Sequence, residues 1–403
     1  MASYDVAVVG AGIVGLATAR EIVRRRSGVS LIVIERESDV AQHQTGHNSG
    51  VIHGGIYYEP GSLRARLCVE GSALMYEYAE QHAIPHERCG KLIVALGADE
   101  LPRLDQLERR AIANSVPGLR RVSGAELHEI EPNAAGIAAL HAPNTGIIDY
   151  PAVCRSIRRE LEAQNIEFRV DAEVLRIEQG TQCRLVLKDT QLHATEVTAT
   201  ETVVCAGLWS DRLARRSGAP AEPRVVPFRG VYLRLKPTAT PVVNGMVYPV
   251  PDPTLPFLGV HVTRHINGGV MLGPTAMLVP SRDGYLFRTV RAGDIWETLS
   301  WPGTWRMART YWRTGVDELR MAASTRAYVR AAARYVPAIT ISDVEPSFHS
   351  SVRAQALNRN GELVDDFAIS RTGAVTHVRN APSPAATSAL ALARELVDRI
   401  EAG

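Results

Sequence analysis

Apolar and polar positions at the start of the chain follow a strand, turn, helix, strand order. A strand pattern covers residues 4–9 and runs into a glycine-rich turn at 10–15. A helical pattern continues to about residue 26, and a second strand pattern covers 30–35. This order is typical of a βαβ unit and predicts the beginning of a parallel sheet.

Two later segments have the same character. A helical pattern at 152–164 precedes a strand pattern at 167–177, and a buried-strand run at 201–206 ends in Ala206 and Gly207. We expect these strands to join the first unit in one parallel sheet.

The pattern changes after residue 224. Short β-rich pieces broken by prolines, at 225–235, 246–250, 258–263 and 269–272, predict an antiparallel sheet covered on one face. Residues 281–337 are helical in pattern, and 348–403 returns to strands and closes with a helix at 384–401.

The predicted fold class is therefore α/β, or α+β overall, with two interleaved domains. We expect a Rossmann-like nucleotide-binding domain at 1–85, 145–223 and 345–403. A substrate domain at 86–144 and 224–344 would contain the antiparallel sheet, with 281–337 as a helical insertion.

Composition narrows the class of protein. The 403 residues are 45% hydrophobic and 22% charged, which is typical of a globular protein of more than one domain. The net charge of +2 argues against a nucleic-acid partner. The five cysteines are odd in number and include no C-x-x-C pair, so we expect neither disulfides nor a metal site, and a reducing, cytoplasmic location. The apolar run at 6–16 is short and lacks a basic lead, so we expect no signal peptide or membrane span.

The glycine turn carries the first chemical signal. Gly10 permits a tight turn, Gly12 lets the backbone approach a pyrophosphate, and Gly15 lets the helix pack closely on the strand. Glu35 stands 20 residues after Gly15, at the end of the next strand, where its carboxylate can accept both ribose hydroxyls. This placement predicts a dinucleotide at the start of the first helix.

FAD and NAD share this motif, and the following segment favours FAD. Residues 42–58 are small or hydrogen-bonding and include no Asp, Glu, Lys or Arg, so the loop can wrap a ribityl chain and an isoalloxazine edge. Two further turns bring backbone N–H groups to the same cofactor, one after the strand at 201–206 and one at 380–387. The cofactor residues predicted from these segments are Thr45, Asn48, Ser49, Gly50, Ala206, Gly207, Pro384, Ala385, Ala386 and Thr387.

Several longer motifs resemble the L-2-hydroxyglutarate oxidase/dehydrogenase family, within the D-amino-acid-oxidase-type FAD oxidoreductases. They are HQTGHNSGVIH (43–53), GIYY (55–58), CGK (89–91), PFRG (227–230), YPVP (248–251), LGVH (258–261), VRAQ (352–355), LVDDF (363–367) and NAPSPAAT (380–387). The resemblance implies oxidation of L-2-hydroxyglutarate to 2-oxoglutarate, with FAD as first acceptor and a quinone, another respiratory acceptor or oxygen as the next. It also implies that Arg36 and Val174 contact the cofactor.

Oxidation of a 2-hydroxy acid moves a hydride from C2 to flavin N5 while a base takes the hydroxyl proton, and histidine is the natural base. His53 and His261 are the two candidates. His261 is predicted to end a strand, and with Tyr248 it resembles the Tyr and His pair that flanks substrate in related amine oxidases.

Arginine binds a carboxylate bidentately, and the substrate carries two carboxylates. Arg353 resembles the arginine that holds the carboxylate in D-amino-acid-oxidase-type enzymes. Arg229, Lys91 and Arg264 are weaker candidates for the second carboxylate.

The stretch 281–337 holds ten arginines against five acidic residues and four of the five tryptophans. It suits either a membrane surface, as a quinone-linked enzyme on the inner face of a membrane would need, or a packed helical cap or subunit contact, which we prefer. An amine or amino-acid oxidase of the same fold, or a non-catalytic or RNA-modifying flavoprotein, remains the rival function.

Overall fold

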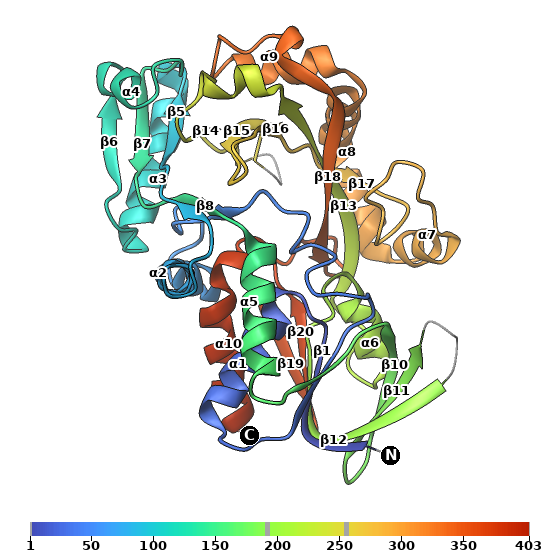
Figure 1. Ribbon diagram of the computed structural model, residues 1–403. Coiled ribbons are helices and arrows are strands. Elements are labelled where there is room, and N and C mark those ends of the chain that lie inside the picture. Colours follow the sequence, from blue (N-terminus) through green and yellow to red (C-terminus); the bar gives the residue numbers. More distant parts are fainter. Residues whose placement is uncertain (1, 190–193, 254–257, 403) are drawn as a thin grey trace.

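The computed structural model describes residues 2–189, 194–253 and 258–402. Figure 1 shows two layered units, with a mixed sheet and long helices below and a curved sheet with the insertion helices above. A small third sheet, formed by β3 (Val51–Ile52), β8 (Gly146–Ile148) and β4 (His86–Glu87), lies at the junction.

The lower unit is the nucleotide-binding domain, built on an eight-stranded sheet. Its strands are β1 (Ala2–Val9), β2 (Leu31–Ile34), β9 (Glu167–Arg169), β10 (Ala172–Gln179), β11 (Cys183–Asp189), β12 (Ala194–Val204), β19 (Ala368–Thr372) and β20 (Val375–Asn380). Strands β9, β2, β1, β12 and β20 pair in parallel, as the βαβ pattern predicts.

The single strand expected at 167–177 is wrong in its extent. It is split into β9 and β10 at Asp171, whose φ of +54° lies in the left-handed region and ends the extended run. Only β9 joins the parallel part, because β10 pairs antiparallel with β11 and β11 antiparallel with β12.

Helices α1 (Ile13–Arg25), α5 (Tyr150–Glu162) and α10 (Ala385–Glu401) bury apolar faces in one core with β1 and β2. Helix α2 (Leu63–Gln81) packs on α10 at Gly71, where a Cβ would lie 2.6 Å from the Ser388 Cα atom. Helix α6 (Ser210–Arg216) follows β12. Because α1 and α10 are packed together, both helix N-termini are held in fixed positions.

The upper unit, predicted as the substrate domain, is a nine-stranded sheet in the order β17-β13-β16-β15-β14-β5-β7-β6, with β18 paired to β13. The strands are β5 (Lys91–Ala95), β6 (Arg120–Ser123), β7 (Ala138–Ala142), β13 (Arg224–Leu235), β14 (Met246–Pro249), β15 (His261–Arg264), β16 (Val270–Gly273), β17 (Met277–Leu278) and β18 (Val344–Leu357). All pairs are antiparallel except β14 with β5. The expected boundary at 345 differs from the structure, since β18 pairs with β13 along most of its length and so belongs to this sheet.

Strand alternation gives the two faces of this sheet different roles. Leu92, Val247 and Val262 enter a core that also holds Val329 and Ala332 of α9 (Thr325–Ala333). Their neighbours along each strand, among them Lys91, Tyr248 and His261, therefore point to the opposite face. Helices α3 (Leu101–Ala113) and α4 (Gly124–Ile130) flank β6 and β7.

The insertion is helical only from residue 292. It contains α7 (Ala292–Leu299), α8 (Pro302–Ala323) and α9, whereas 281–291 is irregular apart from turns. Short 3-10 helices lie at Ala98–Glu100, Gly207–Trp209, Pro237–Val242 and Ile341–Asp343. Within the described ranges, no helix is both long and apolar enough to cross a bilayer.

Candidate active site

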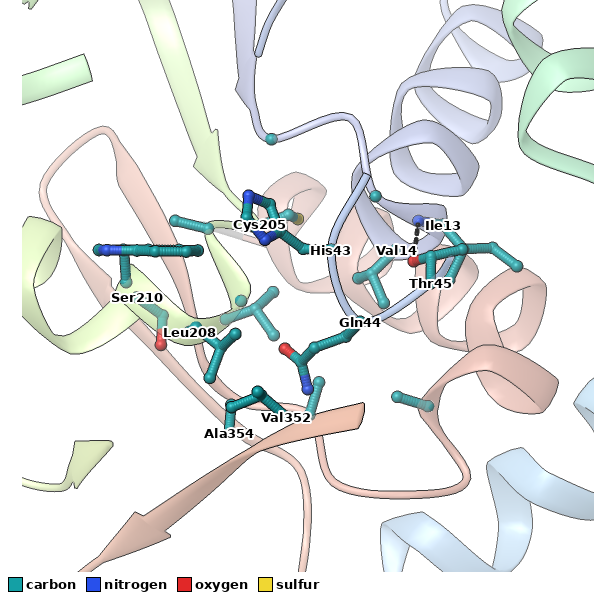
Figure 2. A pocket seen from close by; sticks show the side chains of 18 of the residues that line it. Ile13, Val14, His43, Gln44, Thr45, Cys205, Leu208, Ser210, Val352 and Ala354 are labelled. Carbon is teal, nitrogen blue, oxygen red and sulfur yellow. Dashed lines mark hydrogen bonds between the residues drawn. The ribbon is translucent and has the colours of Figure 1, made fainter. Parts of the chain in front are cut away.

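A cavity of about 790 Å³ opens between the two domains, within the size range of cofactor sites. Its walls come from the β1–α1 turn, the loop after β2, the end of β12, β18, and the turn before α10. Figure 2 shows the Gln44 side chain extending from the loop toward β18, where Val352 and Ala354 lie.

The glycine turn has the geometry that the motif predicts. Gly10 has a φ of +102°, and a Cβ there would lie 2.5 Å from the Cys205 carbonyl oxygen. A Cβ at Gly15 would lie 1.9 Å from the Gly10 oxygen, so the helix can pack on the turn only with glycine. Gly12 is the N-cap of α1 and offers no side-chain cap, while Ile13 N–H donates to Thr45 Oγ1 at 3.2 Å (Figure 2). The start of α1 therefore faces the cavity as an anion site.

Three of the predicted cofactor residues, Glu35, Arg36 and Val174, line the cavity. The Glu35 carboxylate accepts from Ala11 N–H at 2.6 Å and from Glu37 N–H at 3.0 Å, and it lines the cavity. The Arg36 guanidinium lies 3.7 Å from the centre of the Trp209 ring. Arg36 and Val174 both line the cavity, as expected from the resemblance.

The loop after β2 is braced by its own side chains. Asn48 Nδ2 donates to Thr45 O at 2.8 Å, and Asn48 Oδ1 accepts from Gly50 N–H at 2.7 Å. Gly50 has a φ of +69° and does not itself line the cavity, whereas Thr45, Asn48 and Ser49 do. Asn48 and Gly50 thus shape the loop that presents the other residues.

A second helix N-terminus faces the same cavity. Ala206, Gly207 and all four residues 384–387 line it, and the N-cap of α10, Pro384, has no side-chain cap. Thr387 Oγ1 accepts from His53 N–H at 3.1 Å and so ties α10 to the loop. The positive end of the α10 dipole can stabilise negative charge on a group bound here.

The residues present fit FAD. Among the described residues, five buried polar atoms of cavity-lining residues have no hydrogen-bond partner: His43 Nδ1, His53 Nδ1, Ser351 Oγ, Arg379 Nε and Asn380 Oδ1. Buried polar atoms in native proteins are almost always paired, so these five indicate a polar ligand. Two helix N-termini and the Glu35 carboxylate suit the pyrophosphate and ribose of a dinucleotide.

His261 begins β15 rather than ending a strand, because the extended run starts at this residue. Its Nδ1 lies 2.9 Å from the Gly259 carbonyl oxygen and carries the proton, which leaves Nε2 as an acceptor. The ring stacks on Tyr248 with centres 3.9 Å apart. Burial, reinforced by the charges of Lys91 and Arg353, lowers the pKa of His261 to about 3, so the ring is neutral at neutral pH.

His53 is half-buried and also neutral. Burial and the nearby charges of Lys91, Arg64, His261 and Arg353 lower its pKa well below the usual value. His53 lines the cavity, whereas His261 stands at the start of β15 in the upper sheet and is not one of the residues that line it. The structure thus brings both candidate bases within electrostatic reach of each other.

The candidate carboxylate ligands fall into two groups. Arg353 lines the cavity on β18, and Lys91 is buried beside Tyr248. Arg229 instead donates to the carbonyl oxygens of Gly284 (2.6 Å) and Leu286 (2.8 Å). Arg264 pairs with Glu87 at 2.9 Å. Both of these arginines hold the protein's own segments together, so their guanidinium groups already have partners in the free protein.

Sequence reasoning missed a row of rings along the cavity. The centres of His43 and Trp209 are 4.9 Å apart, those of His47 and Tyr285 4.1 Å, and those of His47 and His349 5.8 Å. Two of the three histidines of the 43–53 motif, His43 and His47, gave a signal, since they stand four residues apart in that loop. Tyr285 gave none, because it lies in the irregular start of a segment predicted as helical.

Comparison with known proteins agrees with this site. The family model described as "FAD dependent oxidoreductase" (DAO) matches residues 5–399. The chain is 42% identical to the mitochondrial L-2-hydroxyglutarate dehydrogenase of Homo sapiens, over 99% of this chain and 89% of that protein. It is 40% identical to the L-2-hydroxyglutarate dehydrogenase of Indibacter alkaliphilus, over 96% of each.

Solved structures support the fold. The FAD-bound L-alpha-glycerophosphate oxidase of Mycoplasma pneumoniae superposes with a TM-score of 0.81 at 22% identity, covering 100% of this chain and 95% of that one. Glycine oxidase of Geobacillus kaustophilus gives 0.70 at 20% identity, with coverage of 100% and 95%. The chain belongs to the DAO family of FAD-dependent oxidoreductases and, within it, to the family of the L-2-hydroxyglutarate dehydrogenases.

Proposed function

We propose that the protein oxidises L-2-hydroxyglutarate to 2-oxoglutarate. The observation that carries the proposal is a pair of neutral histidines, His53 and His261, beside a cavity that fits FAD and near the cation Arg353. The relatives that are 40–44% identical over nearly the whole chain are named for this substrate. FAD, when bound, supplies the acceptor for the hydride that leaves C2.

The chain's own residues orient the substrate and take its proton. Arg353 binds the C1 carboxylate, which fixes C2 relative to the cavity. His261 Nε2 accepts the hydroxyl proton as the C2–H bond breaks and C2 and its oxygen form the carbonyl. The two negative charges of the substrate raise the pKa of His261 from its low value in the free protein, which makes it a better proton acceptor.

Anaerobic mixing with substrate tests this proposal. We expect L-2-hydroxyglutarate to bleach the visible absorption of the bound flavin within one turnover and D-2-hydroxyglutarate to leave it unchanged, since fixed groups present only one C2–H face. Bleaching by amino acids instead would support an amine or amino-acid oxidase. A flavin that neither class of substrate reduces would support a non-catalytic flavoprotein.

The partner we propose is an anionic bilayer surface, reached through the insertion. Trp305, Trp312 and Leu319 of α8, which is kinked at Tyr311, stand seven residues apart and are 59–60% exposed. On α7, Trp296 is 73% exposed. Exposed arginines of the same segment are Arg288, Arg291, Arg306, Arg309, Arg313 and Arg320. Interfacial aromatic side chains with interspersed cations match the chemistry of an anionic lipid headgroup layer.

This surface adjoins the cavity, which favours a lipid-soluble acceptor. Asp283 and Arg291 line the cavity, and the exposed Leu286, Phe287 and Val290 lie between them in sequence. A quinone dissolved in the bilayer would therefore meet the protein next to the cofactor site.

Sedimentation with vesicles tests the partner. We expect binding to phosphatidylglycerol vesicles, little binding to phosphatidylcholine vesicles, and loss of binding in Trp305→Ala/Trp312→Ala. Ile112→Ala, which removes an exposed apolar side chain on α3, is the matched control. The face is instead a subunit contact if the parent protein does not bind vesicles and forms oligomers at high protein concentration. In that case Trp305→Ala/Trp312→Ala should stay monomeric.

A further inference from the structure

Lys91 is a buried cation on the substrate face of the upper sheet. Its side chain is 1% exposed, and its Nζ atom lies 4.1 Å from the centre of the Tyr248 ring and 5.6 Å from that of Tyr57. It pairs in register with Met246 of β14, while its neighbour Leu92 points into the opposite core.

In the described part of the chain, Lys91 has no carboxylate partner. The groups that favour its charged form are the thiols of Cys68 and Cys89, and burial outweighs them, lowering the pKa of Lys91 to about 7. An unpaired charge in the interior is strongly unfavourable, so proteins keep one where a ligand completes the pair. The missing partner is an anion that arrives from outside.

The order of strands places His261 between two cations. Across the sheet, Arg353 stands on β18 at one side, His261 on β15 in the middle, and Lys91 on β5 at the other side. The sheet curves above the junction between the two units (Figure 1). The charges of Lys91 and Arg353 both lower the pKa values of His53 and His261.

We propose that Lys91 binds the C5 carboxylate of the substrate and thereby makes the enzyme select 2-hydroxy acids with a second carboxylate. The inference rests on the proposed function: Arg353 binds the C1 carboxylate, His261 meets the C2 hydroxyl, and Lys91 receives the far end. The cation–π contacts with Tyr248 and Tyr57 hold the ammonium in place between turnovers.

The test compares two substrates that differ only at C5. In Lys91→Met, kcat/KM for flavin reduction by L-2-hydroxyglutarate should fall about 10²–10³-fold, as expected for loss of a buried charge pair. The value for L-2-hydroxyvalerate, which ends in a methyl group, should stay within about threefold of the parent. Lys91→Arg keeps the charge and should restore much of the preference, and Lys236→Met, at an exposed position, should change neither value.

A binding measurement without turnover keeps the test independent of the reaction. Glutarate should raise the melting temperature of the FAD-loaded parent and perturb its flavin spectrum, and Lys91→Met should lose most of this response. Valerate should affect both proteins equally.

Two outcomes would overturn the inference. If Lys91→Met loses both substrates equally with its flavin content and circular dichroism intact, Lys91 serves the reaction itself. If glutarate binds Lys91→Met as tightly as the parent, Lys91 is not a carboxylate ligand. If the parent oxidises no 2-hydroxy acid but Lys91 still governs glutarate binding, the proposed reaction fails and the dicarboxylate site stands.

Discussion

At the scale of single residues, His53 and His261 are both candidates for the base that takes the hydroxyl proton. His261 donates from Nδ1 to the Gly259 carbonyl oxygen, so its Nε2 is the nitrogen that can accept a proton, which suits a base. We expect His261→Ala to slow flavin reduction by about 10²–10⁴-fold while 2-oxoglutarate still binds. Stopped-flow reduction with saturating substrate measures this. The same loss in His53→Ala, with His261→Ala at the parent rate, would give the role to His53.

A substitution at Arg353 should affect substrate binding more than the chemical step. If it grips the C1 carboxylate both before and during the reaction, Arg353→Ala should raise KM by the equivalent of about 2–5 kcal/mol. Some loss of kcat should accompany it, because the substrate is less well oriented. Steady-state kinetics with a dye acceptor provides both constants, and an unchanged KM would exclude Arg353 from the substrate site.

The pKa of Lys91 predicts a pH dependence. Its charged form binds the dicarboxylate, so affinity for glutarate is full below about pH 7 and falls as pH rises through the pKa of Lys91. A bound dianion raises that pKa, so the complex keeps its proton to higher pH than the free protein. Titration of the parent against Lys91→Met, which should show a flatter profile, measures the effect.

The groups around Lys91 titrate outside this window. Burial raises the pKa of Cys68 to about 12 and that of Cys89 to about 11, and it raises those of Tyr57 and Tyr248 still further from neutrality. His53 and His261 titrate well below it. A transition near pH 7 that survives in Lys91→Met would assign the effect to another group.

At the scale of secondary structure, the turn between β1 and α1 controls whether the cofactor can bind. A Cβ at Gly12 would touch only Thr45 Oγ1, at 3.5 Å, so the apo fold tolerates a side chain there. The pyrophosphate would need the same space, and Gly12→Val should purify folded but colourless. Absorbance of the flavin relative to protein measures occupancy, and Gly315→Val, with open space around it, is the control. Full occupancy in Gly12→Val would refute this placement.

The elements of the nucleotide-binding domain were predictable because their apolar runs are long and their turns are marked by glycine. Strand β6 was not, since three of its four residues are exposed and only Val122 is buried. The left-handed backbone at Asp171, which separates β9 from β10, carries no pattern that distinguishes it from a surface position within a strand. Local sequence thus specified the parallel core better than the edges.

The candidate site follows the same rule. The glycine turn, Glu35 and the 380–387 turn are contiguous motifs, and all reach the cavity. Arg229 and Lys91 looked alike in sequence, as lone cations in strands. Their difference arises from distant segments, because Gly284 and Leu286 occupy the Arg229 guanidinium and no described carboxylate approaches Lys91.

A buried ion-pair network joins the insertion to the rest of the molecule. Arg282, 3% exposed, contacts the carboxylate of Asp211 on α6, which is fully buried, and also Glu297 on α7 at 3.2 Å. Arg212 of α6 pairs with Glu297 as well. The network fixes α7, which precedes the exposed face of α8, against the nucleotide-binding domain.

Arg282→Met should therefore destabilise the whole protein. It leaves Asp211 buried without its guanidinium, at a cost of about 3–5 kcal/mol. Denaturant unfolding followed by circular dichroism measures the loss. Arg320→Met, whose pair with Asp317 is exposed, should change stability by less than about 1 kcal/mol. Equal effects of the two substitutions would show that the network carries no stability.

The cofactor cavity takes one helix start from residues 10–15 and the other from residues 384–387. During synthesis the first of these leaves the ribosome long before the second exists. A nascent chain can thus fold its βαβ unit early. It cannot complete the cofactor cavity until almost all of the chain described here has emerged from the ribosome. Cofactor capture must therefore await the synthesis of residues 384–387, and a premature stop codon before residue 384 would leave the cavity without its second helix start.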